Sequence, residues 1–312
     1  FVHWRHSTRW RIVENFKPPI SVLVPAYNEG KVIAATLRSV LATNYSSPVE
    51  VIVVDDGSTD DTYAAAEVVA KEDSRVRLFS QINQGKASAL QLALNEAANE
   101  IVIFIDADTR IARDAFTKLV QPLADARVGA VSGHARVGNR RSFLARCQDL
   151  EYVCGFNLDR RAYSVWNCIT VAPGAISAFR KTAIAAAGGF SRDTLAEDTD
   201  LTLSVHRAGY RVDYVHGAIA WTEAPETVRT LAKQRFRWAF GTLQSIWKHR
   251  DLTFSRRIPG LGWFSLPSVW FFQLVLVAAA PLIDLSFLYA VVVNKQIAVL
   301  PYFLAFIGAD LV

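Results

Sequence analysis

Two carboxylates one residue apart, Asp106 and Asp108, follow an unbroken apolar run at 101–105. The run is rich in isoleucine and valine, which is typical of a strand buried on both faces. A carboxylate is unfavourable in such surroundings without a partner, so two of them at one strand end indicate a cleft or a bound cation. Hard divalent cations such as Mg²⁺ take oxygen ligands and often share them with substrate phosphates. The spacing alone fits a metal–diphosphate site and an acidic turn about equally well, and the rest of the chain must decide between them.

Four more polar side chains stand directly after apolar runs, or in the loop that follows one: Tyr27, Asp55, Asp56 and Lys86. The loop after the first run reads Pro-Ala-Tyr-Asn-Glu-Gly, with one glycine, so the glycine-rich phosphate loop of a dehydrogenase is absent from the sequence. No Walker-type loop occurs either. Without such a loop, a cation on paired carboxylates, supported by cationic side chains, is the natural way to hold a diphosphate.

These side chains must be positioned by the elements that precede them. Segments rich in Val, Ile and Leu at 20–24, 49–54 and 101–105, and the segment Arg-Val-Arg-Leu-Phe at 75–79, predict four strands. Three segments of helical character separate these strands. The first is at 31–43, the second follows Asp60 and ends at about residue 71, and the third is at 87–98. Strand–helix alternation at this spacing predicts an α/β fold with a mostly parallel sheet flanked by helices. Ligands bind beyond the carboxyl ends of the strands in such sheets, so we expect the polar side chains to converge there.

The middle of the chain is less regular. We expect a strand over 128–134, a long helix over 142–163 and a β-rich segment over 169–179, in which the small residues from Gly174 onward would let the backbone approach a sugar. The helix places Cys147 and Cys154 on one face, where packing in the core is the favoured role. The chain has three cysteines, an odd number without zinc spacing, which fits a reducing compartment better than a disulfide framework.

A second acidic pair, Glu197 and Asp198, stands at the start of a helix predicted over 199–208. Acids at a helix N-terminus are ordinary as caps and dipole partners. The alternative is a general base, with Glu197 beside it at the substrate. A carboxylate base needs burial or a neighbouring acid to raise its pKa toward neutral, and two adjacent acids in a closed cleft would supply that shift.

A helix predicted over 226–249 mixes basic and aromatic residues, which suits a membrane surface; ordinary packing on the domain is the alternative. Within it Gln234, Arg237 and Trp238 supply an amide, a guanidinium that can bind phosphate, and an aromatic ring for stacking.

The composition points to a membrane. Of the 312 residues 51% are hydrophobic and eight are Trp, and from 263 to 280 there is no charge over about the length that spans a bilayer. Pro281 and Asp284 follow, so a kinked span or a short re-entrant hairpin would fit; a buried helix of a large soluble domain is the alternative. A second apolar stretch begins at 297, which makes a multi-pass protein the expectation.

The distribution of basic residues around the apolar stretch predicts how the chain is oriented in the membrane. Four cations precede the apolar stretch, Lys248, Arg250, Arg256 and Arg257, against Lys295 after it, so the globular part is expected on the cytoplasmic side of the plasma (inner) membrane. The net charge of +5 is too mild to suggest nucleic acid. The chain begins at Phe1 and lacks methionine, so we expect it to be part of a longer protein.

Five motifs in order resemble the processive family 2 glycosyltransferases, the membrane-integrated synthases of cellulose, chitin, hyaluronan and poly-N-acetylglucosamine. They are Pro25-Ala-Tyr-Asn-Glu29, Asp55-Asp56-Gly57-Ser58, Asp106-Ala-Asp108, Glu197-Asp198 and Gln234-Arg-Phe-Arg237-Trp238. The resemblance covers about 20–312. Ala196 departs from it, since the family usually has threonine there, which concerns packing of the loop more than chemistry.

The resemblance implies a GT-A fold and an inverting reaction. Tyr27 and Asp55 or Asp56 would hold uracil and ribose, and Asp106 and Asp108 would carry Mg²⁺ or Mn²⁺ at the diphosphate of a UDP-sugar donor. It also implies the domain division, which is a lead-in or interfacial segment (1–19), a cytoplasmic catalytic domain (20–224), amphipathic interface helices (225–262) and a transmembrane region (263–312).

On the same resemblance Lys86 would reach the donor and Asp198 would take the proton of the attacking hydroxyl. Gln234 and Trp238 would seat the terminal sugar of a polysaccharide acceptor, and Arg237 would neutralise the leaving diphosphate. Membrane lipid and accessory export subunits complete the implied partners.

The run Pro173-Gly-Ala-Ile-Ser-Ala-Phe-Arg180 most resembles the poly-N-acetylglucosamine, chitin and hyaluronan branch, which favours UDP-N-acetylglucosamine over UDP-glucose. Two alternatives stay open. One is a non-processive transferase that adds a single sugar to a lipid, and the other is a subunit that binds or moves nucleotide sugars without catalysis.

Overall fold

Strands and helices alternate through the first part of the chain in the computed structural model, which describes residues 16–295, 298 and 301. The four predicted strands and the three helices between them are confirmed. The elements are β1 (Ile20–Ala26), α2 (Ile33–Leu41), β2 (Val49–Asp55), α3 (Thr62–Glu72), β3 (Val76–Ser80), α4 (Lys86–Glu96), β4 (Ile101–Phe104), β5 (Arg110–Ile111), α5 (Ala115–Leu119) and the 3-10 turn η1 (Gln121–Ala124).

The next part completes the sheet and adds the helices beside it. Its elements are β6 (Val128–Val137), α6 (Phe143–Glu151), the π-helix η2 (Tyr152–Leu158), α7 (Asp159–Val165), β7 (Ser177–Arg180), α8 (Lys181–Ala186), α9 (Glu197–Arg207), β8 (Arg211–Thr222), α10 (Val228–Lys248) and the 3-10 turn η3 (Arg250–Leu252). The long helix predicted over 142–163 is present, but its middle widens into the π-helix η2, which no sequence pattern indicated.

The strands form one eight-stranded sheet in the order β3-β2-β1-β4-β7-β6-β8-β5. The first four are parallel neighbours, as predicted. Beyond β4 the sheet is mixed, because β7 runs antiparallel to both β4 and β6 while β6 and β8 are parallel. Four of the seven pairings are therefore parallel, so the sheet is mixed rather than simply doubly wound.

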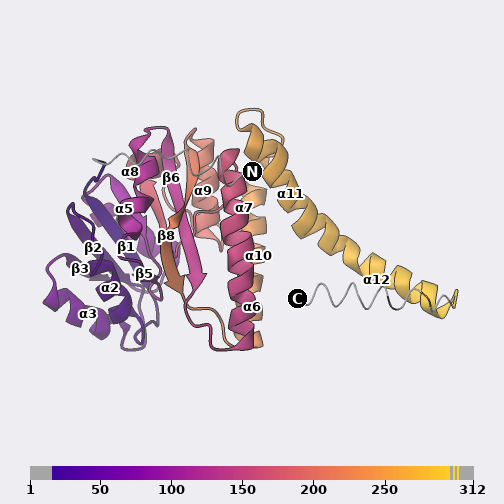
Figure 1. The fold of residues 1–312 in the computed structure, drawn as a ribbon, viewed down its shortest axis with the longest axis horizontal. Helices are drawn as coiled ribbons and strands as arrows, with labels where there is room; N and C mark the ends of the chain where they lie inside the picture. Colours follow the sequence, from indigo (N-terminus) through magenta and orange to yellow (C-terminus); the bar gives the residue numbers. More distant parts are fainter. Residues whose placement is uncertain (1–15, 296–297, 299–300, 302–312) are drawn as a thin grey trace. The chain divides into compact units, whose positions relative to one another are not determined.

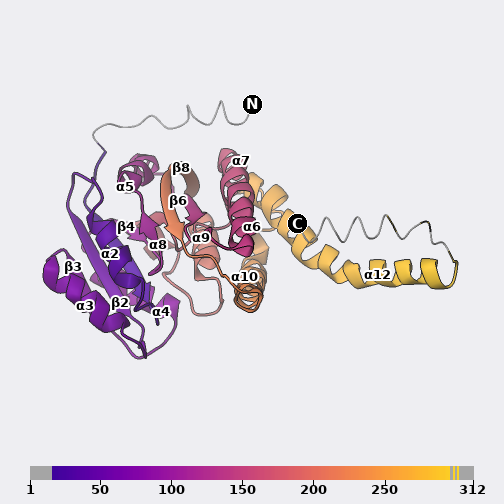
Figure 2. The same cartoon turned by 60° about the horizontal axis from the view of Figure 1, so that its bottom comes forward.

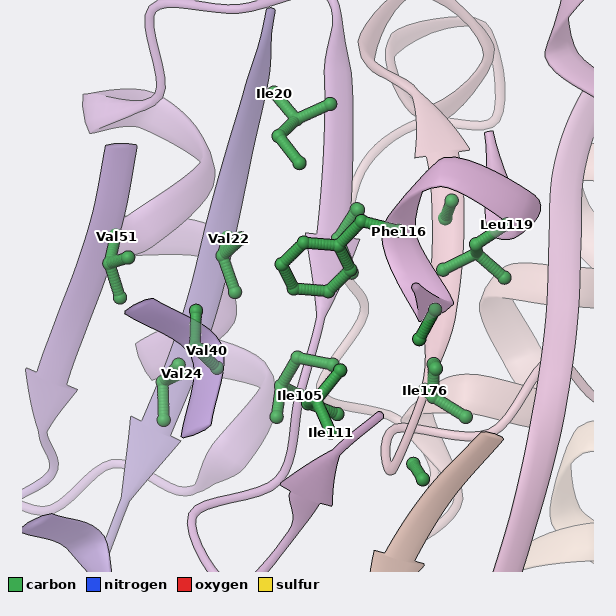
Figure 3. Close-up of a cluster of buried hydrophobic side chains, with 14 of the residues drawn as sticks. Ile20, Val22, Val24, Val40, Val51, Ile105, Ile111, Phe116, Leu119 and Ile176 are labelled. Atoms are coloured by element: carbon green, nitrogen blue, oxygen red, sulfur yellow. The ribbon is translucent and has the colours of Figure 1, made fainter. Parts of the chain in front are cut away.

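Side chains alternate between the two faces of β1, and each face has its own core. Val22 and Val24 point into the cluster drawn in Figure 3, which α2, α3 and α5 cover with residues such as Leu37 and Phe116. Leu23 points the other way, into the cluster covered by α4, α8 and α9. Burial on both faces explains the unbroken apolar sequence of these strands.

The helical segment α6–η2–α7 and the helix α10 lie beside one another at one side of the sheet in both views (Figures 1 and 2). An ion pair joins them, from Arg235 on α10 to Glu151 on α6 at 2.5 Å. Their rings also meet, since Trp238 lies 6.0 Å from Phe156, centroid to centroid. Residues more than 80 positions apart thus form one wall, next to the edge of the sheet.

The chain divides into two units, the first ending at Ser265 and the second beginning at Leu266. An apolar helical run, long enough to cross a membrane, extends over Leu261–Val292. It comprises η4 (Leu261–Ser265), α11 (Leu266–Trp270), η5 (Phe271–Val275) and α12 (Leu276–Val292). Because Pro281 lies inside α12 and the helix continues past it, the re-entrant hairpin is not formed.

Only one candidate span lies within the described residues, so the multi-pass expectation is not supported. The second apolar stretch expected from 297 lies, apart from residues 298 and 301, outside the described part of the chain, as do residues 1–15 of the expected lead-in segment. The core role expected for Cys147 and Cys154 is wrong, because both are exposed on the outer face of the helical segment, whereas Cys168 is buried.

Candidate active site

The carboxyl ends of β1, β2 and β4 lie together because these strands are parallel neighbours. Tyr27 and Asp56 come directly after the ends of β1 and β2, Asp106 is two residues past the end of β4, and Asp55 is the last residue of β2. The backbone ties them closely, since the amide of Asp56 donates to the carbonyl of Ala26 at 2.8 Å. The structure thus places these side chains at one edge of the sheet, as the alternation of elements predicts.

Asp55 and Asp56 are both buried but differ in their hydrogen bonds. Asp56 accepts from the side chain of Gln81 at 2.6 Å and from the backbone amides of Gln84 and Gly85 at 2.9 and 2.8 Å. It therefore holds the loop that leads into α4. Asp55 keeps a buried oxygen, Oδ1, without a partner among the described residues. Asp55 is thus the one with an acceptor left for a ligand, while Tyr27 is 48% exposed and offers its ring.

Lys86, the first residue of α4, links the two acidic motifs. Its ammonium donates to Asp106 Oδ1 at 2.7 Å and to Glu197 Oε1 at 2.9 Å. Burial disfavours the charged lysine, but the two carboxylates outweigh it and raise the pKa of Lys86. The lysine is therefore a fixed positive charge between the end of β4 and the start of α9.

Gly174 makes this arrangement possible. A Cβ at this position would lie 2.6 Å from Lys86 Nζ and 2.8 Å from Asp106 Oδ1, closer than real contacts allow. The small residue expected to let the backbone approach a sugar is thus in contact with the ion pair. Whether a sugar also approaches there stays a prediction.

Negative charge accumulates around the spaced carboxylates. Burial and then Asp106 raise the pKa of Asp108 to about 6, although Thr109 and Thr222 each donate a hydroxyl hydrogen bond to its Oδ1 at 3.1 Å. Burial raises the pKa of Glu29 to about 7, and Asp108 is the largest charged contributor. Glu29 was not among the predicted site residues, although it follows the first strand at the same edge.

The donor set fits a hard divalent cation. Carboxylates crowded until their pKa values rise are sites where a positive charge is favourable. Mg²⁺ and similar ions commonly take one or two protein carboxylates and complete their shell with water and substrate phosphates. Asp106 and Asp108 offer that number, and the described residues contain no group of three or more His, Cys, Asp or Glu arranged as a complete metal site.

Asp198 is the second residue of α9, and its Oδ1 accepts from the backbone amide of Thr199 at 2.7 Å. The N-cap of α9 is Ala196, so neither acid caps the helix. Burial and then Glu197 raise the pKa of Asp198 to about 6, although the charge of Lys86 opposes them. A carboxylate with a pKa in this range can accept a proton at neutral pH.

The three predicted residues of α10 lie on a helix that packs beside η2. Trp238 is half-buried against the ring of Tyr152, at 6.5 Å between centroids, and the guanidinium of Arg235 lies over it at 4.7 Å. Gln234 has a buried Oε1 without a partner among the described residues. Arg237 is exposed, and within the described part of the chain no ion pair joins it to the carboxylates. The role of Arg237 at the diphosphate stays a prediction.

The second half of α10 instead fixes the loop before Asp198. The side chain of Gln244 accepts from the amide of Leu195 at 3.0 Å. Gly241 packs so closely that a Cβ there would lie 2.7 Å from the nitrogen of Ala196. One turn into α9, Asp200 contacts Lys248 and His249 at the end of α10. The position of α9 is thus set by α10, a long-range relationship that the sequence pattern did not reveal.

Taken together, the mixed sheet, its edge of carboxylates and the base-like Asp198 have the GT-A glycosyltransferase architecture, and the comparisons agree. Residues 18–241 match the family described as Glycosyltransferase like family 2. The chain belongs to this family and is a glycosyltransferase. The alternative of a binding subunit without catalysis is therefore not supported.

Among named proteins, the chain is similar to poly-beta-1,6-N-acetyl-D-glucosamine synthases. It is 33% identical over 236 residues to that of Staphylococcus aureus (strain COL), which covers 73% of this chain and 57% of the relative. It is 33% identical over 223 residues to that of Staphylococcus epidermidis, covering 71% of this chain and 54% of the relative. The chain thus spans less than two thirds of the length of these curated relatives.

Two solved structures have the same fold. The mannosyltransferase PcManGT from Pyrobaculum calidifontis, in complex with GDP-Man and Mn²⁺, aligns with a TM-score of 0.68 and 28% identity over 89% of this chain and 81% of its own. TarS 1–349 of S. aureus, in complex with UDP-GlcNAc, aligns with a TM-score of 0.51 and 20% identity over 67% of this chain and 59% of its own. The second likeness concerns the fold alone.

Proposed function

We propose that the chain carries the catalytic part of an inverting, membrane-bound glycosyltransferase that transfers N-acetylglucosamine from UDP-GlcNAc to the end of a growing β-linked polysaccharide. The observation that carries the proposal is the ion-pair chain from Asp106 through Lys86 to Glu197. It puts Asp198, which follows Glu197, beside the carboxylates suited to a diphosphate. The groups that bind the sugar donor and the base that activates the acceptor therefore lie in the same site.

The donor end follows from the strand edge. The exposed ring of Tyr27 offers a face for uracil, and the unpaired Oδ1 of Asp55 can accept from the base or the ribose. Asp56 keeps the loop before α4 in place. Lys86 contributes positive charge beside the diphosphate.

The proton chemistry belongs to Asp198. The acceptor hydroxyl oxygen attacks the anomeric carbon, the bond from that carbon to the phosphate oxygen breaks, and its electron pair leaves with UDP. Asp198 takes the hydroxyl proton, which makes the oxygen a competent nucleophile. Attack opposite the leaving group in one step inverts the configuration. The carboxylate returns its proton to water after UDP departs.

A Mg²⁺ or Mn²⁺ ion on Asp106 and Asp108 supplies positive charge that stabilises the leaving diphosphate. The Mn²⁺ of the PcManGT complex supports this assignment. Gln234 and Trp238 on α10 suit the acceptor sugar, since they offer an amide oxygen and a ring. Arg237 on the same helix is exposed, so its guanidinium is free to bind the leaving diphosphate.

The relatives named as poly-N-acetylglucosamine synthases support GlcNAc as the donor sugar. A second candidate is GDP-mannose, favoured by the likeness to PcManGT. The test incubates membranes containing the protein with labelled UDP-GlcNAc, UDP-glucose or GDP-mannose and digests the product with linkage-specific hydrolases. Incorporation from UDP-GlcNAc into a hydrolase-sensitive product is expected. Incorporation only from one of the other donors would overturn the donor assignment.

Membrane attachment and processivity complete the proposal. The apolar run Leu261–Val292 is the span, and the cations before it put the catalytic unit on the cytoplasmic side. Residues 20–224, 225–262 and 263–312 are the proposed catalytic, interface and membrane parts, with export subunits as partners. A ladder or smear of long products on a gel is expected, whereas one added sugar per acceptor would show a non-processive transferase.

A further inference from the structure

The helical segment α6–η2–α7 carries a buried charge that the mechanism above does not use. Arg160 is the second residue of α7, just past the π-helix η2, and is 4% exposed. π-Helical turns are rare and occur often at functional sites, because they displace side chains from regular helical positions. The guanidinium of Arg160 lies over the ring of Phe156 in that turn, at 4.7 Å from the centroid.

Arg160 lacks a full set of acceptors. Its Nη1 is buried and has no hydrogen-bond partner in the described part of the chain. A guanidinium has five N–H donors, and leaving one unpaired in a buried position is costly. The face of Phe156 compensates the charge in part but accepts no ordinary hydrogen bond. The arrangement therefore calls for an oxygen that the chain itself does not supply.

The groups around Arg160 indicate which part of the site would supply the missing oxygen. The charges and hydroxyls that act on Arg160 belong to Tyr214, Asp198, Tyr152 and Asp159. The pKa of Tyr152, raised mainly by burial, is also raised by Asp108 and lowered by Arg160. Arg160 therefore stacks on the ring of Phe156 and is within electrostatic reach of Asp198.

The aromatic side has the character of a sugar-binding surface. Phe156, on which Arg160 stacks, lies 4.5 Å from the ring of Tyr152 and 6.0 Å from that of Trp238. Rings with a few fixed polar groups are the usual lining of a small-molecule site. Because Asp198 and Asp159 already provide negative charge near Arg160, the missing partner need not be an anion. A neutral hydroxyl or carbonyl oxygen is sufficient.

We propose that Arg160 is an acceptor-binding residue, whose Nη1 donates a hydrogen bond to an oxygen of the acceptor's terminal sugar, next to the hydroxyl that Asp198 deprotonates. The inference rests on the proposed function and deepens it. It adds a fixed donor, delivered by α7, to the ring and amide that α10 presents. The planar guanidinium orients the sugar, and stacking on the ring of Phe156 holds the guanidinium in place.

The test compares the full-length protein with Arg160→Met, which keeps most of the volume and removes the charge. UDP release is measured at saturating UDP-GlcNAc against the concentration of a short β-1,6-linked N-acetylglucosamine oligosaccharide. We expect the acceptor KM to rise roughly tenfold or more, as for a lost hydrogen bond to a charged group, and the donor KM to change by less than about twofold. Arg160→Lys keeps the charge but loses the planar guanidinium, so its acceptor KM should lie between those of the wild type and Arg160→Met.

Thermal unfolding separates this role from a structural one. Replacing a buried, incompletely paired charge by an apolar residue is often neutral or stabilising, so Arg160→Met should keep or raise the Tm. A fall in Tm with equal losses toward donor and acceptor would show that Arg160 only supports the fold, as would an unchanged acceptor KM. Arg146→Met, on an exposed arginine of α6, is the matched control and should change neither parameter.

Calorimetric titration with the same oligosaccharide gives a readout that does not need turnover. Weaker binding to Arg160→Met than to the wild type supports the inference, and equal binding overturns it. If the wild type transfers a sugar from GDP-mannose or UDP-glucose instead, the donor assignment fails. The acceptor KM of Arg160→Met with that donor then still decides the role of Arg160.

Discussion

His249 Nε2 lies 2.7 Å from Asp200 Oδ1, and both side chains are buried. The other oxygen of Asp200 accepts from Lys248 Nζ at 2.9 Å. Asp200 stands two residues after Asp198, and the two basic residues close α10 and follow it. The contact therefore joins the helix that carries the proposed base to the helix that carries the proposed acceptor residues.

We expect Asp200→Asn to lower both stability and turnover. Removing the carboxylate leaves the buried His249 without its charged acceptor and leaves Lys248 with Asp193 alone, a loss of roughly 2–4 kcal/mol in the free energy of unfolding. The start of α9 should then be less well held, so kcat should fall more than donor affinity. Denaturant unfolding and steady-state kinetics measure the two effects. A variant with wild-type stability and kcat would show that the contact does not position α9.

The Asp198→Asn variant should lose sugar transfer and retain UDP binding. The amide cannot take the hydroxyl proton, while the carboxylates proposed to hold the diphosphate are untouched. Transfer to acceptor and UDP binding by calorimetry are the measurements. Asp251→Asn, at an exposed aspartate paired with Arg207, is the control and should keep wild-type transfer. Equal transfer by Asp198→Asn and wild type would remove Asp198 from the mechanism.

The pH profile should follow the ionisation of Asp198. Burial and Glu197 raise its pKa from 3.8 to about 6, and a base acts only when deprotonated. The kcat should therefore fall about tenfold per pH unit below pH 6 and level off above it. The raised pKa means that protonating Asp198 stabilises the folded state, so this group does not cause acid unfolding. Circular dichroism at each pH checks that the protein stays folded; a profile flat to pH 5 would contradict the assignment.

Removing the metal should stop turnover. We expect a chelator to abolish transfer and added Mg²⁺ or Mn²⁺ to restore it, and Asp106→Ala and Asp108→Ala to abolish metal-dependent transfer. The loss should reach about a hundredfold or more, as for other electrostatic contributions at a developing charge. Asp114→Ala, at an exposed aspartate on α5's N-terminal side, should behave as wild type. Full activity in chelator would exclude the metal assignment.

A methyl group at position 174 should disturb the ion pair without unfolding the protein. Gly174→Ala places a Cβ 2.6 Å from Lys86 Nζ, so the flexible lysine must move away from Asp106. We expect reduced kcat with a Tm close to that of the wild type. Gly138→Ala is the control, because its Cβ would meet Trp221 at an ordinary 3.4 Å. Unchanged kcat in Gly174→Ala would mean that the lysine's position is not needed.

The strand edge was predictable from local sequence. Four predicted strands, each followed by polar residues, specify a parallel arrangement, and parallel strands must present their carboxyl ends on the same side. That is why the order of elements alone is enough to bring together Asp55 and Asp106, which are far apart in the chain. Short motifs likewise pointed to Asp198, because an acidic pair before a helix is visible in the sequence.

Side-chain partners were not predictable in the same way. Asp55 and Asp56 are the same residue type, and only the path of the loop at 81–85 shows that Asp56 is already fully bonded. The face on which a helical residue lies is also a tertiary property, so Cys147 and Cys154 were misplaced in the core. The exposure of Arg237 and the burial of Arg160 depend on how α10 and α7 pack, not on their own sequences.

The sequence by itself determined the family, the order of elements and the carboxylates at the sheet edge, because these follow from periodicity and from motifs within a few residues. Only the tertiary structure decided that Lys86 joins Asp106 to Glu197, and that Arg160 is buried without a partner for Nη1 among the residues described. Both depend on contacts between residues distant in the chain. Their energies come from burial and from distance, which no local pattern encodes.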